Sequence, residues 1–244
     1  MKITTDKIVI FFAILITILF ITAISYGSYA TFRGIKKNKI EYYEVYIGNT
    51  LILRFRDRDG YKTSLERTMD LVEKFNKIFR KQPDPKIYDF RFNLKKKSIS
   101  YEDITLIKIT REDINVNKTE LLALGLMWLN RIRIGVLNTK NYKLGHKVTG
   151  WVSWYGRWFH GRKTAYGEIY NRFELTAASL KYPYNTLLVV TNPKNKRKVI
   201  IRINDKGPYV KKRILDLSEG SAYILGMKKE GVKKLIIQVI KIAK

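Results

Sequence analysis

The C-terminal hundred residues limit the fold most tightly, because Gly, Pro and Asn interrupt them at short intervals. Between these turn residues we predict strands over residues 147–156, 186–191, 197–203, 213–218 and 234–242. The one brief helix that we predict in this region covers residues 221–225. Short strands at this spacing, with almost no helix between them, indicate a small closed barrel, which we place at residues 147–244.

Residues 41–138 combine strand-like and helix-like apolar patterns, which predict a small α+β unit. Strand-like runs occupy residues 51–56, 88–92 and 106–109, and in the second of them aromatic residues alternate with charged ones. The carboxylates of this unit are scattered among basic neighbours, so no pattern in it carries recognisable chemistry. We therefore interpret the unit as a spacer or an interaction domain.

Two helices are predicted within the same unit. Thr63 and Glu66 have the spacing of a capping box, which marks the start of the first helix. Its expected buried face consists of five apolar residues: Leu65, Met69, Val72, Phe75 and Phe79. The second helix opens at Thr119 and continues through residues 121–129. Its apolar run is far too short to cross a bilayer, so we expect a buried core helix.

Residues 8–32 contain no charged side chain, and roughly 20 apolar residues are enough to cross the hydrocarbon layer of a membrane. We therefore expect an N-terminal transmembrane helix within residues 1–35, with residues 8–30 inside the bilayer. Basic residues lie on both sides of this run, so the charge rule leaves its orientation open. A cleaved signal peptide is the alternative, and Ser28-Tyr29-Ala30 would then be its small-x-small cleavage site.

The chain of 244 residues carries 48 Lys and Arg against 21 Asp and Glu, a net charge of +27. This balance suits a solvated basic surface or attraction to an anionic polymer or membrane. We expect no nucleic-acid partner, because no nucleic-acid motif accompanies the basic residues. The absence of cysteine excludes disulfides and cysteine nucleophiles. With His146 and His160 as the only histidines, we expect no metal site and no cofactor.

Seven runs in the C-terminal region resemble the rare lipoprotein A family in their order and spacing. They are GWVSWYG (150–156), FHGRKTAYGE (159–168), LTAAS (175–179), YPYNT (182–186), VIIRINDKGP (199–208), RILDLS (213–218) and AYILG (222–226). The resemblance implies a mainly β protein with a six-stranded double-psi β-barrel. It also implies a periplasmic protein of the cell wall, in characterised cases a lytic transglycosylase that cleaves between the two alternating sugars of peptidoglycan.

Two departures from the family pattern bear on function. The family's name reflects a lipidated cysteine, which this chain lacks, so a protein anchor would replace the lipid. The family usually has a histidine in the run at 175–179, where this sequence has Ser179. This second change touches the implied site.

Asp205 is the first candidate catalytic residue. By the two-residue period of a strand, Val199, Ile201 and Ile203 share one face and Asp205 follows on it, whereas Arg202 falls on the other face. If the apolar face lines the barrel interior, Asp205 emerges at its mouth beside a Gly-Pro turn. Partial desolvation there suits a general acid for a glycosidic oxygen. The alternative is an aspartate that only stabilises the turn through backbone N–H groups.

Glu168 is the second candidate catalytic residue, because the resemblance places it across the same groove. Two carboxylates that face one cleft are a common arrangement for glycan cleavage. In a lytic transglycosylase the sugar's own 6-hydroxyl closes on the anomeric carbon, so one carboxyl can act first as acid and then as base. An exposed loop carboxylate is the alternative for Glu168. We interpret Asp216 as a structural, hydrogen-bonded carboxylate.

Six further residues are candidate substrate contacts: Tyr155, His160, Thr176, Ser179, Arg202 and Tyr209. Tyr155, Tyr209 and the neighbouring Trp158 are candidates for stacking on sugar rings. His160 is a candidate for orienting its loop or contacting a sugar. Arg202 either binds substrate carboxylates or is solvated on the outer face.

Together these patterns predict a peptidoglycan lytic transglycosylase that is anchored in the inner membrane through residues 8–30, with its barrel in the periplasm. If the N-terminal segment is cleaved, the protein is secreted. The unit at residues 41–138 would then lie near the membrane and contact other envelope or division proteins. One alternative is a catalytically silent glycan-binding protein, and another is an expansin-like protein that loosens the wall without breaking bonds.

Overall fold

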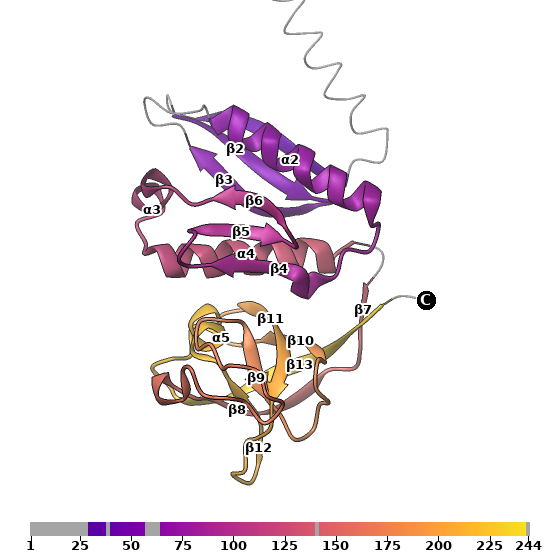
Figure 1. Ribbon diagram of the computed structural model, residues 1–244, viewed down its shortest axis with the longest axis vertical. Helices are drawn as coiled ribbons and strands as arrows, with labels where there is room; N and C mark the ends of the chain where they lie inside the picture. Colours follow the sequence, from indigo (N-terminus) through magenta and orange to yellow (C-terminus); the bar gives the residue numbers. More distant parts are fainter. Residues whose placement is uncertain (1–28, 38–39, 57–63, 140–141, 243–244) are drawn as a thin grey trace, which may run out of the picture.

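The computed structural model describes residues 29–37, 40–56, 64–139 and 142–242 (Figure 1). The expected membrane helix therefore falls almost entirely outside the described residues. Within these ranges no helix is both long enough and apolar enough to cross a membrane. The end of the uncharged run is not helical, because Ala30 begins strand β1 (Ala30–Lys37) and its N–H donates to Asn76 Oδ1 at 2.9 Å. Residues 30–35 are thus part of the folded unit that we expected to begin only at residue 41.

The first sheet is antiparallel and joins β1, β2 (Ile40–Ile47) and β3 (Thr50–Arg56) in that order. In β3, Leu53 and Phe55 are buried and Arg54 and Arg56 are exposed, which confirms the alternation predicted for residues 51–56. Helix α2 (Ser64–Lys81) packs across all three strands (Figure 1).

The buried face of α2 differs from the predicted one. Its buried residues are Ser64, Thr68, Leu71, Phe75, Ile78 and Phe79. Met69, which we expected in the core, is 53% exposed. The prediction followed the largest apolar side chains, whereas the short side chains of Ser64 and Thr68 face the sheet, where they let the helix lie close to it. Thr63, one half of the predicted capping box, lies outside the described residues.

A second antiparallel sheet joins β4 (Phe90–Asn93), β5 (Ser98–Tyr101) and β6 (Ile104–Lys108). The strand predicted over residues 88–92 begins two residues late, because Tyr88 lies in the 3-10 turn η1 (Ile87–Asp89).

Helix α4 (Leu121–Leu137) lies between the two sheets and confirms the predicted core helix, although it continues beyond residue 129. A Cβ at Gly125 would lie 2.4 Å from the Phe92 ring, so only glycine allows this approach.

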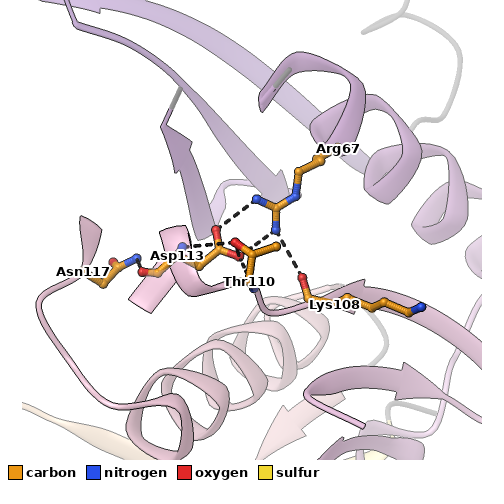
Figure 2. Close-up of polar contacts among 5 residues, drawn as sticks. All are labelled: Arg67, Lys108, Thr110, Asp113 and Asn117. Atoms are coloured by element: carbon orange, nitrogen blue, oxygen red, sulfur yellow. Dashed lines mark hydrogen bonds and ion pairs between the residues drawn. The ribbon is translucent and has the colours of Figure 1, made fainter. Parts of the chain in front are cut away.

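A single arginine ties α2, β6 and the short helix α3 (Arg111–Val116) together (Figure 2). Arg67 donates to both carboxylate oxygens of Asp113, at 3.0 and 2.7 Å, and to the Lys108 carbonyl at 3.2 Å. Asp113 also forms a capping box with Thr110 at the start of α3. One buried carboxylate thus fixes the helix start and the packing of α2 at once.

The C-terminal part is a closed barrel of six strands, as predicted. They are β8 (Val148–Trp154), β9 (Thr176–Ala178), β10 (Leu187–Thr191), β11 (Lys198–Asp205), β12 (Arg213–Leu217) and β13 (Val232–Ile242). Their order is β10-β11-β9-β12-β8-β13, and pairing of β10 with β13 closes the barrel. Helix α5 (Glu219–Leu225) confirms the predicted brief helix. Strand β9 was not predicted, because three small residues show no alternation. Strand β7 (Tyr142–Leu144), also not predicted, pairs with the end of β13.

Helix α4 also contacts the barrel, where it packs against β11 and α5 (Figure 1). The side-chain amide of Asn130 bonds to the backbone of β11, donating to the Lys198 carbonyl at 2.8 Å and accepting from Ile200 N–H at 3.0 Å. The buried apolar residues of both parts form one continuous cluster.

Candidate active site

The loop of residues 157–171, between β8 and β9, folds into a tight hairpin that presents Glu168. Lys163 pairs with Ile169, and Thr164 N–H donates to the Glu168 carbonyl at 2.7 Å. The turn closes through Gly167, whose φ of +86° favours glycine. The backbone thereby fixes the direction in which the Glu168 side chain leaves the loop.

The Glu168 carboxylate is clamped by Arg202 of β11. Arg202 Nη1 donates to Oε1 and Nη2 to Oε2, both at 2.6 Å, which is a bidentate pair. Tyr184 Oη donates to Oε1 at 2.5 Å, and Asn204 Nδ2 lies 3.5 Å from Oε2. Asn185 Oδ1 accepts a further bond from Arg202 Nη1 at 2.8 Å. Both oxygens of Glu168 are therefore already engaged by donors.

This clamp determines the charge of both partners. The hydrogen bonds from Arg202 lower the pKa of Glu168 to about 2, although burial opposes them. Burial is the largest single influence on the pKa of Arg202 and lowers it, but the combined effects of Glu168 and Tyr88 raise the pKa above its ordinary value. Glu168 is consequently ionised at neutral pH and has no proton to donate.

Asp205 lies at the end of β11, where a register shift changes its face. Ile203 is opposite Ala177 of β9 and Asp205 is opposite Ala178, so Asn204 is an extra residue in the strand. Because neighbouring residues of β9 point to opposite faces, Asp205 does not share the face of Ile203. Our prediction of that shared face was wrong: the bulge turns Asp205 to the side of Arg202.

The Asp205 carboxylate is held through one oxygen only. Oδ1 accepts from the backbone N–H groups of Ala165 and Lys206, each at 2.8 Å. No residue in the described part of the chain donates to Oδ2. One oxygen is thus fixed by the hairpin that carries Glu168, and the other is available to a ligand.

Asp216 of β12 lies on the same face of the sheet as Asp205. Strand β9 runs between β11 and β12, and its Ala178 is paired with Asp205 on one side and with Asp216 on the other. At a strand spacing of about 4.8 Å, the backbones of Asp205 and Asp216 are roughly 10 Å apart. Ser153 Oγ donates to Asp216 Oδ1, and Arg213 Nη2 lies 3.7 Å from Oδ2. These contacts agree with the structural role expected for Asp216.

Two of the predicted substrate contacts are inaccessible. Thr176 has no exposed area, and Ser179 is 1% exposed. Ser179 Oγ donates to the Ile214 carbonyl and accepts from the N–H groups of Lys181 and Tyr182, each at 3.1 Å. Neither hydroxyl can contact a glycan in this arrangement, and Ser179 forms a turn instead.

The predicted aromatic contacts divide into two kinds. The ring of Tyr155 is already stacked on Tyr170, with centroids 4.5 Å apart. Its buried hydroxyl has no hydrogen-bond partner among the described residues, and burial raises its pKa, with smaller contributions from neighbouring charges. Tyr209, by contrast, is 78% exposed, so its ring is free to meet a sugar.

The structure shows no contact of His160 with Asp205 or Glu168 among the described residues. His160 borders an open depression of about 590 Å³ whose lining residues are Arg157, Trp158, His160, Arg172 and Phe173. Trp158 is 75% exposed, and the depression has no acidic lining. His160 Nδ1 accepts from Arg172 N–H at 3.3 Å, which agrees with a role in orienting the loop. No group of three or more His, Asp or Glu in the described ranges is placed to hold a metal ion.

Sequence reasoning missed four residues of the site. Tyr184, Asn185 and Asn204 contact Glu168 or Arg202, and all three lie in runs that carry the family resemblance. The runs mark these positions but do not show which of their side chains point toward Glu168. The fourth, Tyr88, lies under Arg202 but comes from the α+β unit, and nothing in the sequence connects the two.

Residues 147–237 match the model of a protein family described as "Lytic transglycolase". The chain is 45% identical over 109 residues to the endolytic peptidoglycan transglycosylase RlpA of Campylobacter jejuni, an alignment that covers 43% of this chain and 40% of that protein. It is 46% identical over 98 residues to the protein of the same name from Pasteurella multocida, covering 40% and 33%. The chain thus spans well under half the length of these relatives.

Proposed function

Because the C-terminal domain of this chain is a double-psi β-barrel of the rare lipoprotein A family, we propose that the protein is a lytic transglycosylase acting on peptidoglycan glycan strands. The observation that carries the proposal is the unequal state of the two candidate carboxylates. Glu168 is ionised and held by donors, whereas Asp205 is fixed at one oxygen and open at the other.

In the proposed reaction Asp205 serves first as acid and then as base. Its proton passes to the glycosidic oxygen as the bond from that oxygen to the anomeric carbon breaks. The 6-hydroxyl of the same sugar then closes on the anomeric carbon and gives its proton back to Asp205, so no water enters. Glu168 stays ionised and paired with Arg202, so it takes no part in the proton transfer and instead borders the site through its oxygens.

We further propose a location in the cell envelope, with the run at residues 8–30 as a membrane tether. Signal-peptide cleavage, and with it secretion, is the alternative. The α+β unit and the barrel are proposed as separate domains, with the first extended to begin at Ala30. Substrate contacts are proposed at Tyr209 and around His160 and Trp158, where exposed aromatic and basic side chains gather.

A second candidate function has its own support. A glycan-binding protein without catalysis is favoured by Ser179, which replaces the family's histidine and uses its hydroxyl within a turn. On this alternative the barrel binds glycan without cleaving it.

The two functions are separated by incubating purified sacculi with the detergent-solubilised full chain and analysing the products by mass spectrometry. Products ending in 1,6-anhydro-muramyl groups support the proposal, and reducing ends mean hydrolysis instead. Retention on sacculi without any product identifies a binding protein, and weakening of the wall without product identifies expansin-like loosening.

A further inference from the structure

Arg202 contacts the α+β unit as well as Glu168. Its guanidinium carbon lies 4.3 Å from the centre of the Tyr88 ring, which belongs to the 3-10 turn η1. Arg202 is 9% exposed, and its Nε has no hydrogen-bond partner among the described residues. Of the two aromatic rings near this guanidinium, Tyr88 is closer than Tyr184, whose ring centre lies 5.8 Å away.

The Tyr88 ring is itself held by a second arginine. The guanidinium carbon of Arg133, on α4, lies 4.7 Å from the same ring centre. Arg133 is 3% exposed, and its Nη2 donates to the Phe90 carbonyl at 2.8 Å. Burial lowers the pKa of Arg133 to about 10, which still leaves it charged at neutral pH. The Tyr88 ring therefore makes cation–π contacts with two buried arginines at once, and both contacts favour its present position.

The same helix fixes the strand that carries Arg202. Asn130 of α4 bonds to the backbone of Lys198 and Ile200, and Ile200 is two residues before Arg202. The α+β unit thus sets both the position of β11 and the plane of the Arg202 guanidinium.

We propose that the α+β unit is a working part of the active site, in which Tyr88 is a positioning residue that holds Arg202 in the orientation needed to pair with both oxygens of Glu168. This inference rests on the proposed function, because it concerns the same carboxylate. Without the ring, the long Arg202 side chain gains rotamers, and the bidentate pair gives way to a single hydrogen bond. Small displacements of such a group reduce turnover more than they reduce binding.

The test compares variants of the detergent-solubilised full chain. Tyr88→Leu removes the ring, Tyr88→Met fills a similar volume without a π face, and Tyr88→Phe keeps the ring. The matched control is Tyr101→Leu, which removes a buried tyrosine of the same unit that does not contact Arg202. Melting curves establish which variants are folded.

Two readouts respond to positioning and not to loosening of the fold. The first is the ionisation of the Glu168 carboxyl at pH 4, followed by carbon NMR and assigned with Glu168→Gln. We expect it to be ionised in the parent chain, in Tyr88→Phe and in Tyr101→Leu, and partly protonated in Tyr88→Leu and Tyr88→Met. The second is turnover on sacculi, where kcat should fall about tenfold for Leu and Met with little change in KM, and less than threefold for Phe.

Failure of the inference and failure of the proposed function give different results. If folded Tyr88→Leu and Tyr88→Met leave both Glu168 ionisation and kcat at the parental values, Tyr88 has no positioning role. If Tyr101→Leu produces the same changes, the effect is general loosening and the inference is wrong. If no chain cleaves sacculi but Glu168 becomes protonated only in the Leu and Met variants, Tyr88 positions Arg202 and the lytic function is wrong.

Discussion

Replacing Glu168 by Gln should lower the free energy of unfolding by roughly 3 kcal/mol at neutral pH. The pKa of this carboxyl falls from the ordinary 4.5 to about 2 in the folded protein. A difference of about 2.5, at 1.36 kcal/mol for each pKa unit, corresponds to about 3 kcal/mol of stabilisation of the ionised form. The Glu168 side chain is 27% exposed, so screening by solvent makes the loss of stability somewhat smaller. The buried Arg202 loses its partner in this variant, and an unpaired buried charge makes the loss of stability larger.

The same reasoning predicts how stability depends on pH. Because the folded pKa is depressed, this stabilisation is complete above the unfolded pKa and is lost as the pH falls from about 5 toward 2. The parent chain should therefore lose stability over this range, and Glu168→Gln should lose about 3 kcal/mol less. Urea unfolding followed by tryptophan fluorescence at pH 7, 5 and 3.5 measures both effects, and by pH 3.5 the difference in loss should have reached roughly 1.5 kcal/mol, about half of the total.

Glu230→Gln is the matched control for these measurements, because Glu230 pairs with Lys233 on the exposed surface of the same barrel. We expect this variant to unfold close to the parent midpoint at each pH. The reasoning is refuted if Glu168→Gln unfolds at the parental urea concentration at pH 7. Equal slopes against pH in the parent and in Glu168→Gln would refute it as well.

Three further predictions concern the proposed cleavage and binding of glycan. Asp205→Asn should fold normally, retain glycan binding and lose at least about 10²-fold in turnover, because an amide has no acidic proton of useful strength; normal release of anhydro-muramyl products would place the acid elsewhere. Trp158→Ala should weaken retention on sacculi about tenfold, because the variant loses an exposed ring that can stack on a sugar. Unchanged retention would show that the depression beside His160 does not contact the glycan. Retention by the parent chain should fall between low and roughly 0.5 M salt, because a chain of net charge +27 is attracted by the anionic groups of the wall, and a salt-independent result would assign the affinity to stacking and hydrogen bonds.

The sequence was sufficient for the barrel because its strands carry their own signals. Alternation and turn residues located β8, β10, β11, β12 and β13 closely. Strand β9 escaped because its three residues, Thr176–Ala178, are buried on every side and show no period. At the other end of the chain, the uncharged run hid strand β1, because an apolar strand and an apolar helix look alike over a few residues.

The site was less predictable because its geometry depends on contacts that are distant in sequence. A two-residue period cannot reveal an extra residue, so the bulge at Asn204 reversed the face assigned to Asp205. The same period did not decide whether Arg202 is solvated, whereas in the structure Arg202 is buried and contacts both Glu168 and Tyr88. Pairing between elements, and not local pattern, decided both outcomes.

The division of roles between the carboxylates favours the lytic reaction over hydrolysis. A hydrolase that inverts its substrate needs a second carboxylate with a free oxygen to activate water. Glu168 has no such oxygen, since Arg202 and Tyr184 donate to it at 2.5–2.6 Å. Ser179 offers no base either, because its hydroxyl is committed to a turn. In the proposed reaction Asp205, open at Oδ2, carries the proton in both directions, which suits a nucleophile that is the sugar's own hydroxyl.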